Sequence, residues 1–328
     1  MKTFLSGIQS SGRLHLGNYF GAIRQQVDSQ NQPGEYFYFI ADYHALTSTR
    51  DPDELRDNVM EVALSYLALG LDPEKVVLFR QSDVPEVCEL TWLLSCVTPM
   101  GLLERAHSYK DKVSKGLQAN VGLFTYPVLM ASDILAYDSH IVPVGKDQKQ
   151  HVEMARDIAG TFNHLFGEDC LVIPEPQIPT NELIAKVPGV DGEKMSKSYG
   201  NSIWIFEEGK KLKKAVNQIK TDSREPAEPK DPSELLLMTF LELFLEDAEL
   251  EEWRERIRKG GEDAPGYGHL KVRLIEAMSE LFAPARERRA ELLADKGEVE
   301  RILTRGAEKA RERARATVDR CYRACGIR

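Results

Sequence analysis

Apolar and polar positions follow two different periods along the first half of the chain. Amphipathic stretches with helical spacing are separated by short apolar runs rich in β-branched and aromatic residues, which predict buried strands. These runs cover residues 4–8, 36–41, 76–80 and 141–144. Strands that alternate with helices of this length predict a Rossmann-like α/β fold, in which a parallel sheet is wound on both sides. Ligands of such sheets bind at the carboxyl ends of the strands, so we expect chemistry in the loops after Ile8, Ala41 and Val144.

The sequence also marks the ends of one of the predicted helices. Asp51 is suited to the N-cap and Pro52 to the first helical position. Gly70 is suited to the position just after the last turn, where glycine accepts a left-handed backbone. These residues therefore predict a helix that begins at Pro52 and ends before Gly70.

After about Ile205 the pattern becomes almost wholly helical. Apolar spacing and cap residues predict helices over 207–219, 233–246, 248–259, 269–282 and 298–325. Three prolines, at positions 226, 229 and 232, predict a connector between the first two of these helices. We therefore expect a Rossmann-like domain over residues 1–200, an all-helical C-terminal domain over 201–305, and a final helix over 306–328 that packs back on the first domain.

The composition is that of an ordinary water-soluble globular protein, with 42% apolar and 29% charged residues. No apolar run is long enough to span a bilayer, and the N-terminal segment lacks the apolar core of a signal peptide. The five cysteines form no CxxC pair, so we expect free thiols in a reducing compartment and no metal site. These features predict a cytoplasmic protein with no membrane association.

The charge of the chain is unevenly distributed. A net charge of −9 argues against non-specific binding of nucleic acid. Residues 286–328, however, carry 13 Lys and Arg against 8 Asp and Glu. This segment is either a solvated helix of mixed charge or a surface that faces RNA, and its composition does not separate the two.

The first candidate site is the segment QSSGRLHLGN at residues 9–18. It joins the first predicted strand to the first predicted helix, where free backbone N–H groups and the positive end of the helix dipole suit a phosphate. Gly17 lets a ligand approach the backbone closely, and His15 and Asn18 add side-chain donors on the first turn. Taken alone, His15 and Asn18 are more simply explained as helix caps than as ligands.

The second candidate site is the segment DGEKMSKS at residues 191–198. Lys194 and Lys197 lie three residues apart among small hydroxyl and glycine residues, an arrangement that can hold a pyrophosphate leaving group. A preorganised donor aimed at charge that develops in a transition state contributes about 3–4 kcal/mol. A solvated basic turn is the alternative for any such lysine pair taken singly.

Together the two segments resemble the signature pair of the class I aminoacyl-tRNA synthetases. The KMSKS pentapeptide matches at all five positions, and it follows HLGN in the expected order. HLGN departs from the commoner HIGH form, and Ser10 replaces a proline that is usual in the nearest relatives. Because the tryptophanyl branch usually carries Asn at the fourth place, Asn18 narrows the resemblance to that branch.

Three further segments resemble the tryptophanyl branch. Residues 145–151, GKDQKQH, resemble its GxDQ segment, and residues 126–135, YPVLMASDIL, resemble its amino-acid-binding helix. His44 follows the second predicted strand, where the branch places a histidine in the side-chain pocket. The resemblance covers residues 1–198 and resumes at 306–310.

The helix predicted after Pro127 carries the most specific expectation. Tyr126, Met130 and Asp133 share one helical face by their spacing. Asp133 lies among apolar neighbours, and a buried carboxylate needs a partner, which by sequence alone is an internal group or a ligand. The resemblance implies that this carboxylate accepts the indole N–H of tryptophan. Phenylalanine, which lacks that donor, would then be rejected.

The resemblance implies two sets of site residues, with His15, Asn18, Lys194 and Lys197 as the catalytic ones. The expected ATP-binding residues are Gln9, Ser10, Ser11, Gly17, Asn18, Gly145, Lys146, Asp147, Val187, Lys194, Met195, Ser196, Lys197 and Ser198. The expected tryptophan-binding residues are Leu5, His44, Tyr126, Met130, Asp133, Val142, Val144 and Gln148, with Phe4 as the alternative to Leu5.

The resemblance also implies a reaction and partners. The ionised carboxylate of tryptophan attacks the α-phosphorus of ATP without a general base, with Mg²⁺ on the β- and γ-phosphates. The acyl group then passes to the terminal ribose of tRNA(Trp), whose anticodon the helical domain reads. Members of this branch are homodimers. Residues 87–97 present an apolar face that is either the dimer interface or an ordinary core helix, formed by Leu90, Leu93, Leu94 and Val97.

Three rival interpretations remain at this level. The closest is tyrosine specificity on the same fold, against which Met130 and the GKDQ segment argue. A nucleotidylyltransferase with the related HxGH signature is usually shorter and lacks a helical domain after its catalytic region. A regulatory protein derived from a synthetase tends to lose one signature lysine, whereas Lys194 and Lys197 are both present.

Overall fold

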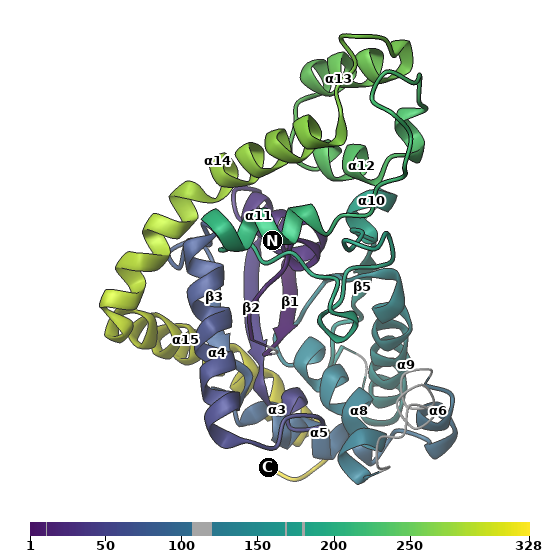
Figure 1. Ribbon diagram of the computed structural model, residues 1–328. Coiled ribbons are helices and arrows are strands. Elements are labelled where there is room, and N and C mark those ends of the chain that lie inside the picture. The colour runs from purple at the N-terminus through teal and green to yellow at the C-terminus, as the bar shows by residue number, and fades with distance from the viewer. Residues whose placement is uncertain (11, 107–119, 168, 179–180) are drawn as a thin grey trace.

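The computed structural model describes residues 1–10, 12–106, 120–167, 169–178 and 181–328. A central parallel sheet is enclosed by helices, and a smaller helical lobe extends from one end of this body (Figure 1). An α/β region comes first and an all-helical region follows it, in the order predicted from the sequence. Ser11, one of the expected nucleotide-binding residues, lies outside the described residues.

The sheet has five parallel strands in the order β3-β2-β1-β4-β5. The strands are β1 (Thr3–Gln9), β2 (Glu35–Ala41), β3 (Val77–Arg80), β4 (Ile141–Pro143) and β5 (Glu175–Gln177). This order, with the first strand central and a reversal of direction beside it, is that of a doubly wound fold. The four predicted strands are confirmed. The sequence did not predict β5, because its three residues, EPQ, form no apolar run and include a proline, which an edge strand tolerates.

The helices of the body are α1 (Leu16–Asn18), a π-helical turn (Tyr19–Ile23), α2 (Arg24–Ser29), α3 (Asp42–Ala45), α4 (Pro52–Ala68), α5 (Glu86–Ser95), α6 (Met100–Glu104), α8 (Val121–Leu135), α9 (Lys149–Phe166) and α10 (Glu182–Ala185). Short 3₁₀ turns are η2 (Gln81–Asp83), η3 (Lys146–Gln148), η4 (Lys197–Tyr199) and η5 (Pro232–Glu234). The second half forms α11 (Gly209–Asn217), α12 (Leu236–Glu242), α13 (Asp247–Lys259), α14 (Tyr267–Ala294) and α15 (Lys296–Ala324).

The predicted caps of α4 are confirmed. The Asp51 side chain accepts hydrogen bonds from the N–H groups of Asp53 and Glu54, and Pro52 is the first helical residue. Gly70 has a φ of 101°, a conformation that glycine adopts without the strain of a Cβ atom. Local side-chain chemistry therefore sets both ends of this helix.

Two helices extend farther than the sequence predicted, and both contain a proline. Helix α8 begins at Val121, before Pro127, because the Asn120 side chain caps it by accepting the Leu123 N–H at 2.8 Å. Helix α14 continues through Pro284 to Ala294 instead of ending near residue 282. A proline inside a helix removes one backbone hydrogen bond, and tertiary burial offsets that loss in both helices.

Alternating side chains of β2 face two separate cores. Tyr36, Tyr38 and Ile40 join a cluster with α4 and α14, which continues into the core of the helical lobe. Phe37 and Phe39 join a second cluster with α5, α8, α9 and α15 on the other side of the sheet. The period of two in a strand therefore places one apolar layer on each face of the sheet.

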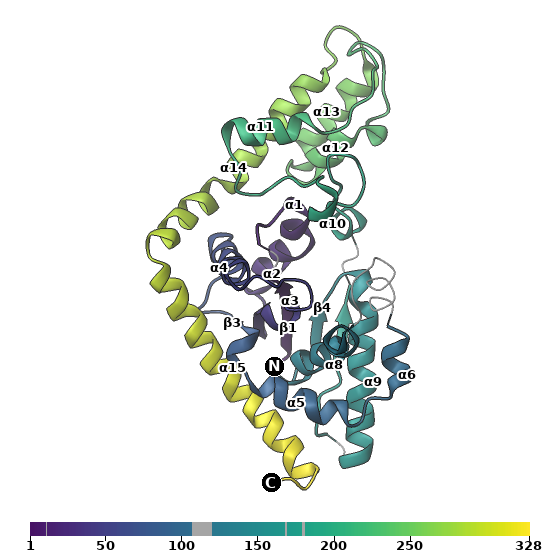
Figure 2. The same cartoon turned by 60° about the horizontal axis from the view of Figure 1, so that its bottom comes forward.

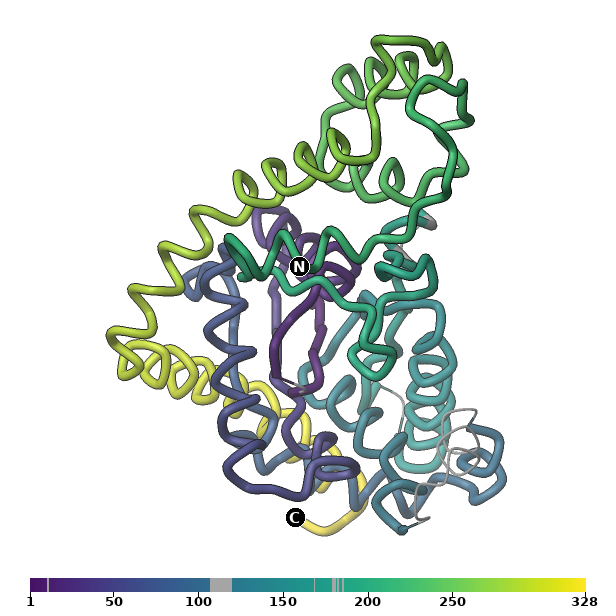
Figure 3. The backbone as a smooth tube through the Cα atoms, viewed as in Figure 1, coloured from purple at the N-terminus to yellow at the C-terminus, as the bar shows by residue number. Residues whose placement is uncertain are grey.

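Helix α14 leads out of the lobe, and α15 then runs along the body, so that the last segment of the chain lies against early strands and helices (Figures 2 and 3). It crosses β3 at Gly306, where an added Cβ would lie 1.8 Å from the Leu78 carbonyl oxygen. Farther along, Arg311 and Arg315 donate to Glu86, whose side chain is only 1% exposed. Burial opposes ionisation of Glu86, but hydrogen bonds from the two guanidinium groups lower its pKa.

The apolar face of α5 is part of this core. The four apolar residues of the predicted face are buried within the chain, between 0% and 9% exposed: Leu90, Leu93 and Leu94 in α5, and Val97 just after it. The idea that this face forms a dimer interface is therefore wrong, because α8 and α15 already cover it. The same helix exposes Trp92 instead. Among the described residues, no helix combines the length and apolar character needed to cross a membrane.

Candidate active site

A cavity of about 640 Å³ opens between β1, β4, α2 and α8, beside the switch point of the sheet. It contains all eight residues predicted to contact the amino acid, which come from five segments far apart in the sequence: Leu5, His44, Tyr126, Met130, Asp133, Val142, Val144 and Gln148. Gln9 and Gly145, both predicted for the nucleotide, also line it. The fold therefore brings the amino-acid residues and these two nucleotide residues together at the carboxyl ends of β1 and β4.

Phe4 and Leu5 both border the cavity, from opposite faces of β1. Phe4 stacks on Tyr36, with ring centroids 4.9 Å apart, in the core cluster that contains α4. Leu5 is 1% exposed and belongs to the cluster that contains α8. Leu5 thus lies on the same side of the sheet as Met130 and Asp133.

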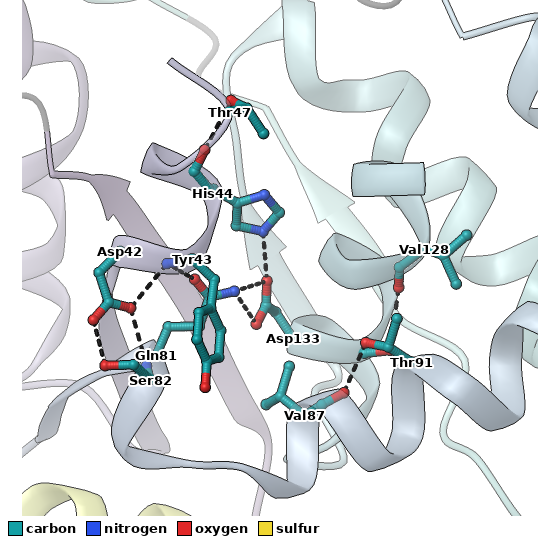
Figure 4. A network of polar contacts seen from close by, with 11 residues as sticks. Asp42, Tyr43, His44, Thr47, Gln81, Ser82, Val87, Thr91, Val128 and Asp133 are labelled. Carbon is teal, nitrogen blue, oxygen red and sulfur yellow. Dashed lines mark hydrogen bonds and ion pairs between the residues drawn. The ribbon is translucent and has the colours of Figure 1, made fainter. Parts of the chain in front are cut away.

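Asp133 is the most deeply buried charged group of the cavity. Its carboxylate accepts from the amide of Gln81 at both oxygens, at 2.8 and 2.9 Å, and lies 2.8 Å from His44 Nε2 (Figure 4). Burial raises the pKa of Asp133, while its contacts with His44 and Gln81 counteract part of that rise. The partner of this carboxylate is therefore internal, and the carboxylate also lines the cavity, so both of the alternatives left by the sequence hold in part.

Gln81 was not among the predicted residues. It is fully buried in η2, directly after β3, and its side-chain oxygen accepts the Tyr43 N–H at 3.1 Å. This bond orients the amide so that its nitrogen faces Asp133. Its position at the carboxyl end of a predicted strand could have marked Gln81 as a candidate site residue. Only the tertiary fold, however, brings that end of β3 beside α8.

Asp42 ties the ends of β2 and β3 together. Its carboxylate accepts the Tyr43 N–H and the Ser82 N–H, each at 3.0 Å, and the Ser82 hydroxyl. Thr91 of α5 donates to Ser132 of α8 at 3.0 Å on the other side of the network (Figure 4). Asp42 therefore joins the segments that carry His44 and Gln81, and both of these side chains contact Asp133 on α8.

A second polar contact lies at the other end of the α8 face. The Tyr126 hydroxyl and His151 Nε2 are 2.8 Å apart, and His151 is 3% exposed. Burial raises the pKa of Tyr126 to about 12, so the phenol stays protonated at neutral pH. The rings of Tyr126 and His44 meet edge to face with centroids 6.2 Å apart. Tyr126 thus connects the amino-acid cavity to α9.

His15 and Asn18 cap each other at the start of α1. His15 Nδ1 accepts the Asn18 N–H at 3.3 Å, and Asn18 Oδ1 accepts the His15 N–H at 3.1 Å. Burial, followed by the nearby charge of Lys197, lowers the pKa of His15 to about 4. His15 is therefore neutral at pH 7, and because Nδ1 accepts, its proton resides on Nε2. The capping interpretation is correct, and it leaves one ring N–H as a donor.

The KMSKS loop contacts this junction. Met195 is 3% exposed, and a Cβ added to Gly17 would lie 3.5 Å from the Met195 Cβ, which is ordinary van der Waals contact. Lys194 is exposed, whereas Lys197 is half-buried. Burial lowers the pKa of Lys197 to about 8, the charge of Glu61 opposes that change, and the charge of Arg13 adds to it.

Asn201 holds the KMSKS loop in place and was also not predicted. Its side-chain oxygen accepts the Ser196 N–H at 2.8 Å, and its amide nitrogen donates to Asp191 and to the Lys194 carbonyl. A Cβ added to Gly189 would lie only 2.3 Å from the Asn201 amide nitrogen, so the packing of this side chain requires glycine there. Asn201 is the buried centre of this loop.

The other predicted nucleotide residues lie around the cavity rather than in its lining. Ser10 is buried, Lys146 and Asp147 form the exposed turn η3, and Ser198 is exposed. Val187 is buried, and its carbonyl accepts the Met195 N–H at 2.9 Å. Its predicted place near the nucleotide therefore concerns its backbone, beside the KMSKS loop.

The doubly wound sheet, the capped strand–helix junction and the KMSKS loop beside it define a class I aminoacyl-tRNA synthetase fold. The sequence model of the family described as "tRNA synthetases class I (W and Y)" matches residues 1–283, and the chain belongs to this family. It is 56% identical to a tryptophan–tRNA ligase of Rhodopirellula baltica, over 99% of both chains. It is 51% identical to the tryptophan–tRNA ligase of Campylobacter jejuni, over 98% of this chain and 99% of that one.

Solved structures agree with this assignment. The tryptophanyl-tRNA synthetase of Campylobacter jejuni, complexed with ADP and tryptophan, superposes with a TM-score of 0.91 at 50% identity. The match covers 99% of this chain and 100% of that one. The similarity therefore extends through the helical lobe and α15, beyond the residues that the family model matches.

Proposed function

We propose that this chain is a tryptophan–tRNA ligase. It activates L-tryptophan with ATP, forming tryptophanyl-adenylate and pyrophosphate, and then transfers the acyl group to the 3′-terminal ribose of tRNA(Trp). The observation that carries the proposal is the Asp133 carboxylate, buried at the edge of an otherwise largely apolar cavity. The relatives named tryptophan–tRNA ligase over nearly their full length support the same reaction.

Asp133 explains the choice of amino acid. Its carboxylate has lone pairs left beside those used by Gln81 and His44, and an indole N–H would fill one of them. Phenylalanine offers no donor to that lone pair, so the site would bind it less well than tryptophan. Tyrosine would need an acceptor at a different place in the cavity.

The nucleotide would bind where the HLGN junction meets the KMSKS loop. Gln9, Gly17 and Asn18 would contact ATP from the first junction, and Gly145 with Asp147 would border its ribose and adenine. Neutral His15 would donate to a phosphate oxygen, since protonation of a buried ring is unfavourable here. The complex of the Campylobacter jejuni protein with ADP and tryptophan supports a shared site for the two substrates.

The residues of this chain would position charges rather than transfer protons. The tryptophan carboxylate is already ionised at pH 7, so it attacks the α-phosphorus in line without a base. Lys194 and Lys197 would stabilise the negative charge of the departing pyrophosphate. Mg²⁺ enters as the ion bound to the β- and γ-phosphates of the ATP substrate. The free cysteines have no part in this reaction.

The division of labour in the chain is part of the proposal. Residues 1–200 form the catalytic domain, residues 201–305 read the anticodon, and residues 306–328 pack against the catalytic domain. The lobe of α12 and α13 lies at the far end of the molecule from α5 and α8 (Figure 1), as a reader of a distant part of tRNA requires. Because tRNA and ATP are its substrates, we place the protein in the cytoplasm.

A homodimer is also part of the proposal, with an interface different from the one first considered. Trp92 in α5, Met100 at the start of α6 and Val121 at the start of α8 are 71%, 63% and 78% exposed. Exposed large apolar side chains favour contact with another protein surface where they form one continuous patch. A second copy of this chain is the expected partner.

Tryptophan-dependent exchange of pyrophosphate into ATP tests the proposed function. We expect exchange with tryptophan, none above background with phenylalanine, and very little with tyrosine. Exchange with tyrosine but not tryptophan would show tyrosyl specificity instead. Adenylate formation without charging of tRNA(Trp) would indicate a regulatory protein derived from a synthetase.

A further inference from the structure

Trp204 lies beside the two signature segments, although neither signature contains it. The residues after the KMSKS loop run antiparallel to the HLGN junction, so that Leu16 N–H donates to the Ile203 carbonyl at 3.0 Å. Ile205 N–H donates to the Leu14 carbonyl at 3.2 Å, which pairs Trp204 directly with His15. The backbone therefore fixes the indole next to the catalytic junction.

Three groups that are or can be cationic surround this indole. The Lys197 ammonium lies 5.9 Å from the ring centroid and the Arg13 guanidinium 4.8 Å from it. The His15 ring centroid lies 6.2 Å away. Tryptophan offers the strongest aromatic face to a cation, and both charged groups are within the 6 Å range of that attraction.

Arg13 is held independently of Lys197. Its guanidinium forms an ion pair with Glu207 at 3.0 Å, and Glu207 belongs to the same segment as Trp204. Like charges on Arg13 and Lys197 repel each other, and this repulsion together with burial favours loss of the Lys197 proton. At 5.9 Å the contact between Lys197 and the indole is near the limit of cation–π attraction, so a charge-assisted hydrogen bond to a phosphate would be stronger.

We propose that Trp204 is a positioning residue for adenylate formation, whose indole holds the Lys197 ammonium beside His15 until the phosphates of ATP draw it away. This inference rests on the proposed function and adds to it a residue outside the two signatures. The indole restricts the Lys197 side chain to one position before ATP binds. The lysine can then contact the pyrophosphate without sampling its other rotamers. Trp204 itself contacts no reacting atom.

A pair of substitutions separates this role from general packing. Trp204→Leu removes the aromatic face, whereas Trp204→Phe keeps a weaker one. We expect Trp204→Leu to lower kcat for tryptophan-dependent pyrophosphate exchange by about three- to thirtyfold, which corresponds to part or all of the rotamer entropy of one lysine side chain. The KM for tryptophan should change less than about twofold, since the amino-acid cavity is untouched. Trp204→Phe should restore most of the lost rate.

Trp253→Leu is the matched control. Trp253 is also half-buried and also packs against a cation, with Arg256 5.1 Å from its ring, but it lies in α13. We expect its replacement to leave exchange unchanged. If Trp204→Leu and Trp253→Leu give equal exchange rates while the unaltered protein is active, the Trp204 proposal fails and the proposed function stands. If the unaltered protein shows no exchange, the proposed function fails first.

Fluorescence provides a second readout that does not depend on turnover. The chain has three tryptophans, so the double variant W92F/W253F leaves Trp204 as the single indole. ATP alone should change its emission as Lys197 leaves the ring, and the further change Lys197→Met should abolish that response. An ATP response of the same size without Lys197 would overturn the proposal, and this holds even if Trp204→Leu fails to fold.

Discussion

Gln81 donates from one amide nitrogen to both carboxylate oxygens of Asp133, at 2.8 and 2.9 Å. The two residues are 52 positions apart, and both are essentially buried. This contact joins the end of β3 to α8, and it holds the carboxylate that we propose as the tryptophan acceptor. The selectivity of the cavity should therefore depend on a residue outside every recognised motif.

Gln81→Leu should weaken tryptophan binding. Without the amide, Asp133 would lose two hydrogen bonds and its pKa would rise further, which weakens it as an acceptor for the indole N–H. Loss of a hydrogen bond to a charged group costs about 1.5–3 kcal/mol, so we expect KM for tryptophan to rise roughly 10- to 150-fold in pyrophosphate exchange. The KM for ATP should not change.

Gln30→Leu is the matched control for that substitution. Gln30 is likewise buried and donates to the Gly70 carbonyl at 2.9 Å, but it lies outside the cavity. It should lower thermal stability without a change in the tryptophan KM. An unchanged tryptophan KM in Gln81→Leu would show that Gln81 supports only the fold.

Asp133→Asn should change specificity more than stability. The amide keeps the shape of the side chain, and its oxygen can still accept from Gln81, but the charge and one acceptor oxygen are lost. Because burial already disfavours the Asp133 charge, we expect the melting temperature to change little. The ratio of kcat/KM for tryptophan to that for phenylalanine should fall by about 100-fold, which parallel exchange assays with the two amino acids would measure. A preserved ratio would remove Asp133 from the role we assign to it.

Lys194→Ala and Lys197→Ala should each slow adenylate formation by about 10²-fold, the loss expected when one group that stabilises developing charge is removed. Tryptophan binding, measured by equilibrium dialysis without ATP, should be unaffected, because neither lysine lines the amino-acid cavity. Equal losses of rate and of tryptophan affinity would mean that the loop has a different role. Lys213→Ala, on the exposed face of α11, is a control for the loss of one surface charge.

The pH dependence of the reaction should reflect Lys197. Burial and the charge of Arg13 lower its pKa to about 8, so the free enzyme loses this positive charge as the pH rises through 8. We expect kcat/KM for ATP to fall above that pH, since this parameter reports ionisations of the free enzyme. Bound phosphates would raise the lysine pKa, so kcat should stay level to higher pH.

Lys197→Met tests the assignment of this alkaline limb. The variant should be slow at every pH and should lack the fall near pH 8. A limb that persists in the variant with the same midpoint would belong to another group. The comparison uses residual activity, so it needs high enzyme concentration and long assay times.

Gly306→Ala should weaken the packing of α15 on the sheet. The added Cβ would lie 1.8 Å from the Leu78 carbonyl oxygen, so helix or strand must move. Overpacking of this kind costs about 1–3 kcal/mol and occasionally more, which denaturant unfolding would measure. Gly268→Ala in α14 is the control, because nothing lies within 4 Å of its added Cβ. That change should stabilise the protein slightly, by about 0.5–1 kcal/mol.

The sequence by itself determined those features of the protein that depend on neighbouring residues. The cap at Asp51, the break at Gly70 and the period of two in β2 each follow from local backbone and side-chain chemistry. The alternation of strands and helices was enough to predict the parallel sheet. The spacing of Tyr126, Met130 and Asp133 placed them correctly on one face of α8.

Only the tertiary structure decided which distant groups meet. Gln81 follows a strand like many other polar residues, and nothing near it in sequence indicates that α8 will bring Asp133 within 2.9 Å. The sequence pattern of the apolar face of α5 does not indicate whether another copy of the chain or α15 covers it. In the folded chain, α15 packs against this face. Likewise, Trp204 and Lys197 meet because the chain after the KMSKS loop turns back along the HLGN junction. Local pattern specifies which face of an element is apolar, but long-range packing specifies what lies against it.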